Sequence, residues 1–150
     1  MTVPVRQVMR RPRFLAMPHT HISDAFEAMS SNDIRHLPVV DESGALVGIL
    51  DERSLMMASF RDPKRPEAPT IFADVTASEI MFLPTSIASP DAPLSDLIIT
   101  MLNHRLTCLP VVDEDDRLCG LLTRTDVISA LCAPPLLSLI HISEPTRRSY

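Results

Sequence analysis

Two stretches of this sequence place the same polar groups three residues apart, in opposite order. The stretch GLLTRTDV carries a hydroxyl at Thr123 and a carboxylate at Asp126. The earlier stretch GILDERSL carries Asp51 and Ser54 at the matching positions. A hydroxyl and a carboxylate that follow an apolar strand can cap the next helix, or they can hydrogen bond to a polar ligand. Both interpretations are open at this point.

A second pair of candidate residues comes directly before each LPVV run. Arg35 and His36 precede the first run. The guanidinium of Arg35 offers paired N–H donors and the imidazole of His36 can carry a proton, and both groups suit a phosphate. The alternative for His36 is a strand-edge histidine with local hydrogen bonds. Thr107 and Cys108 hold the same two positions before the second run and carry no positive charge.

Other arrangements of reactive residues predict no active site. His19 and His21 have metal-like spacing but lack a third ligand, so we expect no metal site. Cys108, Cys119 and Cys132 form no C-x-x-C pair and are expected to be buried thiols in a reducing cytoplasm. No glycine-rich phosphate loop is present. The expectation is a protein that is not an enzyme.

The composition is that of a globular chain. Of its 150 residues, 45% are hydrophobic and 22% are charged, and the net charge of -5 disfavours nucleic acid as a partner. No apolar run approaches the ~18 residues of a membrane span, and we expect a cytoplasmic protein with neither a membrane segment nor a signal peptide. A small basic cluster near the start is expected to be a solvated segment, with contact to an anion or a partner as the alternative. The cluster consists of Arg6, Arg10, Arg11 and Arg13.

The chain contains a tandem repeat of one sequence unit. Residues 8–58 align with residues 80–130 without a gap, and HLPVVDE in the first copy meets CLPVVDE in the second. Two copies of this length predict a pseudo-symmetric pair of supersecondary units instead of a solenoid. Neither unit alone can bury both faces of its small sheet, so we expect the two units to pair and to leave clefts between them.

Each unit shows the same order of patterns. Ser23 and Ser95 are N-cap candidates for a helix, which is followed by the LPVV strand, an acidic turn and a second strand. A short helix is predicted at about 53–59 and again at about 125–132. With a first strand before the helix, the fold class is α/β (α+β), built from two pseudo-twofold-related β-α-β-β-α repeats.

The expected domain organisation follows from the repeat and the proline content. Residues 1–60 form the first repeat, residues 61–74 a Pro-rich linker and residues 75–133 the second repeat. Residues 137–147 read LSLIHISEPTR, which resembles a translated sequencing-library adapter. We therefore expect residues 137–150 to be an artefactual tail, and a further domain could follow in the natural protein.

The repeated unit resembles a known family. The order VM, a helix, LPVVDE, a glycine-containing strand and T-x-x-D resembles the cystathionine-β-synthase (CBS) domain, and two in tandem resemble a Bateman module. The resemblance covers about residues 5–132. It implies a regulatory module that binds an adenosine-containing ligand (AMP, ADP, ATP or S-adenosylmethionine) in the clefts between repeats, usually as a homodimer.

The resemblance also implies roles for individual residues. The carboxylate of Asp126 would accept from the two ribose hydroxyls, and Thr123 would contact ribose or phosphate. The adenine would lie against the first strand and the residues before the second LPVV run, with the phosphates directed at the residues before the first run. Phe82 stands where the family often has threonine, which puts one polar contact in doubt. The implied ligand contacts are Asp126, Thr123, Ser86, Leu106, Thr107, Cys108, Arg35 and His36.

The first repeat lacks the matching groups. Ser54 replaces the ribose carboxylate, Asp51 adds negative charge where an anionic ligand would lie, and Thr107 and Cys108 opposite carry no positive charge. The sequence therefore predicts one competent site, at Asp126, and one degenerate site. The leading hypothesis is an adenine-nucleotide sensor without an obligatory cofactor, acting on a partner or a further C-terminal domain. The alternatives are a ligand-free dimerisation scaffold, and a regulatory fragment of a larger transporter or metabolic enzyme.

Overall fold

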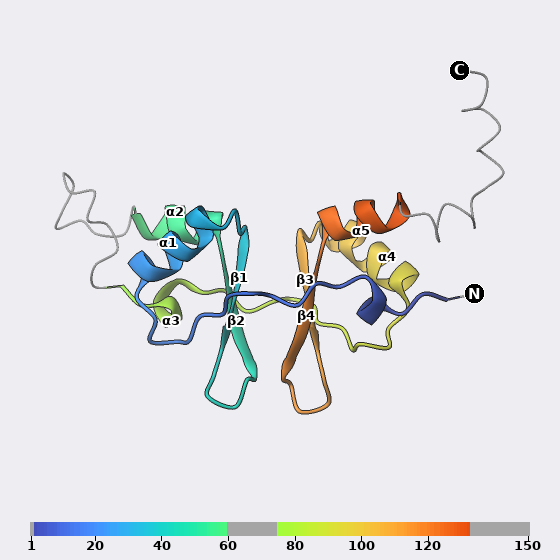
Figure 1. Ribbon diagram of the computed structural model, residues 1–150, viewed down its shortest axis with the longest axis horizontal. Coiled ribbons are helices and arrows are strands. Elements are labelled where there is room, and N and C mark those ends of the chain that lie inside the picture. Colours follow the sequence, from blue (N-terminus) through green and yellow to red (C-terminus); the bar gives the residue numbers. More distant parts are fainter. Residues whose placement is uncertain (1, 60–74, 133–150) are drawn as a thin grey trace, which may run out of the picture.

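A computed structural model describes residues 2–59 and 75–132. The predicted linker at 61–74 and the predicted tail at 137–150 lie outside the described residues. Two hairpins stand side by side, each with helices at its outer side, which confirms the predicted α/β class of two related units (Figure 1). The elements are η1 (Val5–Gln7), α1 (Ile22–Ser31), β1 (His36–Val40), β2 (Leu46–Asp51), α2 (Glu52–Ser59), α3 (Ala77–Ile80), α4 (Leu94–His104), β3 (Cys108–Val112), β4 (Leu118–Thr123) and α5 (Arg124–Leu131).

The two hairpins have the same register. β1 pairs antiparallel with β2 and places Leu37 opposite Leu50, and β3 pairs with β4 and places Leu109 opposite Leu122. These four leucines are buried at the centre of the two hydrophobic cores. The LPVV runs form strands because their β-branched and apolar side chains fill the space between hairpin and helix.

The first strand predicted for each repeat is reduced to one residue. Ala16 bridges Val39 and Ala88 bridges Val111, both in parallel orientation. Prolines on both sides of each alanine lack the N–H that a longer ladder would need. They are Pro12, Pro18, Pro84 and Pro90.

The predicted serine caps of the two long helices are wrong by two residues. α1 begins at Ile22 after His21, and α4 begins at Leu94 after Pro93, so Ser23 and Ser95 lie in the first turns. The first N–H of each helix donates to a backbone carbonyl at the start of the other sequence repeat: Ile22 to Val75 at 2.8 Å and Leu94 to Val3 at 2.7 Å. A backbone hydrogen bond to a distant residue thus caps each helix, in place of the serine side chain that the sequence predicted.

These contacts belong to a reciprocal exchange between the units. The N-terminal segment begins beside α4 and crosses in front of both hairpins before it reaches α1 (Figure 1). Val5, in η1, is completely buried in the core of the second unit, and Ala77, in α3, is completely buried in the core of the first. Each structural unit therefore takes its leading segment from the start of the other sequence repeat.

The exchange explains why methionine and glycine recur together in both copies. A Cβ atom at Gly48 would lie 2.5 Å from the sulfur of Met81, and a Cβ atom at Gly120 would lie 2.7 Å from the sulfur of Met9. Each glycine in a second strand thus leaves room for a methionine from the exchanged segment.

Replacing Gly48 with alanine is expected to destabilise the fold by about 1–3 kcal/mol, because the new methyl group overlaps Met81. In a Met81→Ala background the same substitution should cost much less, since glycine within a strand is itself unfavourable. Urea unfolding of the two single variants and the double variant measures this coupling. Equal costs of Gly48→Ala in both backgrounds would contradict the contact.

Candidate functional site

The candidate residues gather where the two hairpins meet the helices that follow them. The Nε2 atom of His36 lies 3.1 Å from the Oγ1 atom of Thr107, so the residues before the two LPVV runs touch across the units. The hairpin register places Asp51 opposite His36 and Thr123 opposite Cys108. The polar groups of both repeats therefore lie around one junction.

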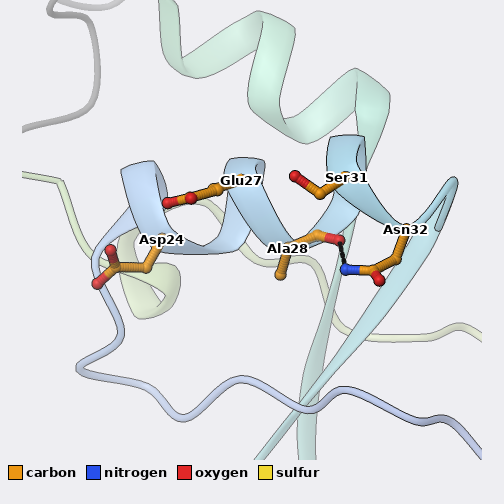
Figure 2. Close-up of a pocket in the computed structure, with 5 residues that line it drawn as sticks. All are labelled: Asp24, Glu27, Ala28, Ser31 and Asn32. Carbon is orange, nitrogen blue, oxygen red and sulfur yellow. Dashed lines mark hydrogen bonds between the residues drawn. The ribbon is translucent and has the colours of Figure 1, made fainter.

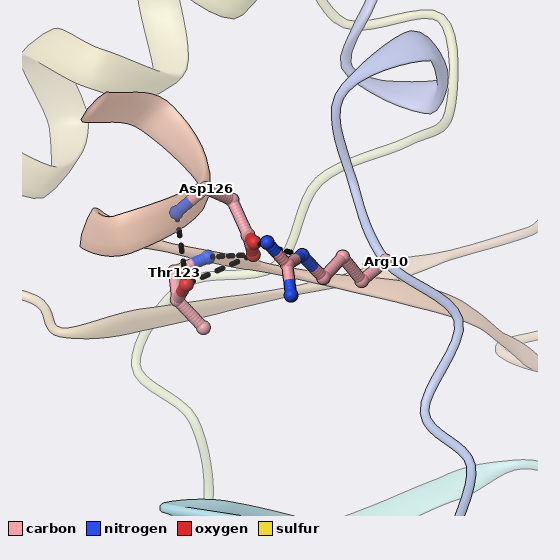
Figure 3. A network of polar contacts seen from close by, with 3 residues as sticks. All are labelled: Arg10, Thr123 and Asp126. Carbon is pink, nitrogen blue, oxygen red and sulfur yellow. Dashed lines mark hydrogen bonds and ion pairs between the residues drawn. The ribbon is translucent and has the colours of Figure 1, made fainter. Parts of the chain in front are cut away.

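Thr123 and Asp126 form a capping box at the start of α5 (Figure 3). The Oδ2 atom of Asp126 accepts from the backbone N–H of Thr123 at 3.0 Å and from its hydroxyl at 2.8 Å. In return, the Thr123 hydroxyl oxygen accepts from the backbone N–H of Asp126 at 3.2 Å. The carboxylate is nearly inaccessible, with 4% of the side chain exposed. The capping interpretation of this pair is confirmed, and the ligand role stays a prediction.

Arg10 pairs with the other oxygen of the same carboxylate. Its Nε atom lies 2.6 Å from Oδ1 of Asp126, and backbone hydrogen bonds to Leu121 hold Arg10 beside β4. Arg6 of the same basic cluster pairs with Asp91. Both arginines are exposed, which agrees with the expected solvated segment, and the exchanged segment also brings them against carboxylates of the second unit.

The contacts of Asp126 limit what it can still accept. A carboxylate has about four acceptor positions, and Thr123 takes two while Arg10 takes one. With these contacts in place, one position on Oδ1 remains, enough for one ribose hydroxyl and not for two. The sequence missed this limit because Arg10 lies more than a hundred residues away along the chain.

The first unit caps α2 with the two groups exchanged. The Oδ1 atom of Asp51 accepts from the backbone N–H of Ser54 at 2.7 Å and from its hydroxyl at 2.8 Å. The order of hydroxyl and carboxylate is thus interchangeable for capping. The repeat offset matches Arg10 with Phe82, and the backbone of Phe82 bridges Ile49 of β2. The doubt that Phe82 raised in the sequence therefore concerns the first unit, and Arg10 holds that position beside Asp126.

The residues assigned to adenine are spread around the start of β3. Leu106 and Thr107 supply carbonyl oxygens to Arg124, at 3.0 Å from Nε and 3.3 Å from the backbone nitrogen. Ser86 is half-buried on the segment that leads to the Ala88 bridge. Burial raises the pKa of the Cys108 thiol to about 12, and the nearby carboxylates of Asp126 and Asp51 act in the same direction. Cys108 is therefore a neutral thiol at physiological pH.

His36 lies at the junction on the side of the first unit, with Arg35 next to it in the chain. Arg35 is exposed and His36 is half-buried at the start of β1. Burial lowers the pKa of His36, and Arg35 lowers it further, against the opposing effects of Asp51 and Glu52. His36 thus favours the neutral form in the folded chain.

The free energy of unfolding is expected to fall as the pH drops below 6.5, the ordinary pKa of histidine. The folded-state pKa of His36 is lowered, so the unfolded chain binds the proton first; the stability present above pH 6.5 is lost down to the folded-state pKa. Urea unfolding between pH 5 and pH 8 should show a smaller fall for His36→Asn than for the wild type. His104→Asn, an exposed position on α4, is the control, and identical slopes for wild type and His36→Asn would contradict the prediction.

A shallow depression of about 290 Å³ lies elsewhere, along one face of α1 (Figure 2). It contains none of the predicted ligand contacts. Within residues 2–59 and 75–132, no group of three or more metal-ligating side chains occurs, and no helix is long and apolar enough to cross a membrane. The depression is lined by Asp24, Glu27, Ala28, Ser31 and Asn32.

Comparison with protein families and curated proteins gives a consistent result. A model of the CBS domain matches residues 5–61 and 65–133. A CBS domain-containing protein of Dictyostelium discoideum is 30% identical over 135 residues, which cover 87% of this chain and 92% of that protein.

Two enzymes match only in part. An L-aspartate semialdehyde sulfurtransferase of Methanocaldococcus jannaschii is 29% identical over 82% of this chain, which spans 22% of the enzyme. An A-adding tRNA nucleotidyltransferase of Aquifex aeolicus is 30% identical over 85% of this chain, which spans 14% of that enzyme. The similarity is thus confined to a small part of either enzyme.

Solved structures share the fold over nearly the whole chain. A structure assigned to an acetoin utilization protein (AcuB) of Vibrio cholerae has a TM-score of 0.78 at 29% identity and covers 95% of this chain and 98% of its own. CBSX2 in complex with AMP has a TM-score of 0.72 at 26% identity and covers 86% and 96%. The CBS domain pair of protein MJ0100, in complex with 5′-methylthioadenosine and S-adenosyl-L-methionine, has a TM-score of 0.71 at 27% identity and covers 87% and 97%.

Proposed function

This chain belongs to the CBS-domain family as a tandem pair, and from that premise we propose that it is a regulatory module that binds an adenosine-containing ligand. Two related domain pairs were crystallised with AMP and with S-adenosyl-L-methionine. The observation that carries the proposal is the buried Asp126 with Thr123 at the junction of the two units. The ligand would lie against Ser86 and residues 106–108, with Arg35 and His36 toward its phosphates.

We expect one ligand site in each chain, in the second unit. In the first unit Ser54 stands where Asp126 stands in the second, and Asp51 adds a negative charge to the capping group. Thr107 and Cys108, across from that site, carry no positive charge. An anionic ligand therefore gains charge-assisted hydrogen bonds at the second site only.

Thermal unfolding with AMP, ADP, ATP and S-adenosylmethionine tests the proposal. A ligand at 100 times its Kd should stabilise the chain by about 2.7 kcal/mol, which raises Tm by several degrees. The shift should be lost in Asp126→Ala and kept in Asp24→Ala, an exposed aspartate on α1. No shift with any ligand at millimolar concentration would reject the proposal.

The second candidate function is a ligand-free dimerisation scaffold. It is favoured by one observation: Thr123 and Arg10 already occupy most of the acceptor positions of Asp126. A purely structural Asp126 would account for the geometry without a ligand. The absence of any thermal shift, together with a stable dimer, would support this candidate.

The outer helices suit contact with a second copy of the chain. Ile99 and Leu102 on α4, and Ile128 and Leu131 on α5, are exposed apolar side chains on neighbouring helices. Covering such a surface is favourable, so we expect a homodimer through these helices. The module would act from the cytoplasm on a partner protein or an attached domain. Sedimentation velocity of Leu102→Asp against the wild type tests the interface, and an unchanged dimer would reject it.

A further inference from the structure

We propose that Arg10 makes the Asp126 site select a phosphate-bearing adenine nucleotide over adenosine and over S-adenosylmethionine. This inference rests on the proposed function, because it names which adenosine-containing ligand the same site takes. It assigns a specificity-determining role to a residue that the sequence placed in a solvated segment.

Arg10 sets the charge that a ligand meets at this site. Asp126 is nearly inaccessible, whereas 71% of the Arg10 side chain is exposed. The ion pair between them cancels the charge of the buried carboxylate. What a ligand approaching the site meets first is therefore a guanidinium group and not an anion.

The guanidinium of Arg10 keeps N–H groups that Asp126 does not use. Arg10 uses Nε for Asp126, and Figure 3 shows one terminal nitrogen directed away from the carboxylate. Planar guanidinium N–H groups match phosphate oxygens in pairs. A phosphate can therefore bind to Arg10 while the pair with Asp126 persists.

Arg10 is held in place at both ends. The backbone N–H of Arg10 donates to the carbonyl of Leu121 at 3.0 Å, and its carbonyl accepts from the N–H of Leu121 at 2.9 Å. The Nε contact with Asp126 fixes the other end of the side chain. Little conformational freedom is left to lose when an anion binds, which favours affinity.

The first unit carries no cation at the position of Arg10. Phe82 holds the position of Arg10 in the first unit, with the same backbone pairing to the second strand of a hairpin. A phenyl ring offers no hydrogen bond to phosphate. The cation is therefore specific to the unit that carries Asp126. S-Adenosylmethionine carries a sulfonium cation on the ribose carbon that bears the phosphate in AMP, and the guanidinium repels a cation at that point.

Isothermal titration calorimetry with AMP, adenosine and S-adenosylmethionine tests the inference. The wild type should bind AMP about tenfold to hundredfold more tightly than adenosine, the equivalent of a charged hydrogen bond. Arg10→Met should bring this ratio well below the wild-type value, with Arg35 and His36 left to contact the phosphate, and Arg11→Met, an exposed neighbour, should keep the wild-type ratio. Since Arg10→Met leaves Asp126 unpaired, Arg10→Lys is the second variant, and it should keep AMP ahead of adenosine.

Each other outcome overturns the inference in a distinguishable way. An unchanged ratio in Arg10→Met would mean that Arg35 and His36 read the phosphate, and the proposed function would stand. Tighter binding of both AMP and adenosine by Arg10→Met would mean that Arg10 competes with the ribose for Asp126. No binding of any of the three compounds by the wild type would reject the proposed function as well.

Discussion

Replacing Val5 with aspartate is expected to lower the free energy of unfolding by at least about 3 kcal/mol, although Val5 lies near the start of the chain. Its side chain is 0% exposed and packs with Leu109 and Leu122 in the core of the second unit. A carboxylate at this position would be buried without a partner. Urea unfolding measures the loss, and amide hydrogen exchange should show β3 and β4 losing protection first.

Gln7→Asp provides the matched control. Gln7 lies in the same short η1 helix and is exposed, so the same charge should change stability by less than about 0.5 kcal/mol. If Val5→Asp were as mild as Gln7→Asp, the N-terminal segment would not belong to the second core. If β1 and β2 lost protection before β3 and β4, the exchange between the units would be wrong.

Replacing Arg10 with methionine is expected to destabilise the chain more than replacing Asp126 with asparagine. Arg10→Met leaves a nearly inaccessible carboxylate without its cation; because 71% of the Arg10 side chain is exposed, the cost should be about 2 kcal/mol, between that of a surface pair and that of a fully buried one. Asp126→Asn leaves an exposed guanidinium and retains an oxygen that can accept from the backbone N–H of Thr123. That loss should be about 1 kcal/mol.

Urea unfolding of the wild type, the two single variants and the double variant measures this asymmetry. In the double variant the buried charge is gone, so the cost should be smaller than the sum of the two single costs. A larger cost for Asp126→Asn than for Arg10→Met would contradict the account of the pair. So would additive costs.

Local sequence signals predicted much of the fold. The two LPVV runs became strands β1 and β3, and the helices expected at about 53–59 and 125–132 begin one residue earlier, at Glu52 and Arg124. These elements follow from apolar periodicity and capping residues, which act over a few positions. The helices that depend on distant backbone partners were placed less well, as Ser23 and Ser95 show.

The exchange between the units could not be predicted in the same way. Both copies carry the same methionine and the same glycine, so the pattern does not say which methionine covers which glycine. Met9 contacts Gly120 and Met81 contacts Gly48. Each methionine thus packs against the glycine of the other copy, because the segment that follows each methionine crosses from one hairpin to the other. The residues around Asp126 could be predicted from the repeat, whereas Arg10 could not, since its place depends on this crossing.

The most direct test of the account is the number of AMP molecules bound per chain, measured by isothermal titration calorimetry on the wild type with Asp126→Ala and Ser54→Ala beside it. We expect one molecule per chain, lost in Asp126→Ala and kept in Ser54→Ala, because only the second unit combines the buried carboxylate with Arg10. Two molecules per chain, or binding that survives in Asp126→Ala, would contradict a single site at Asp126.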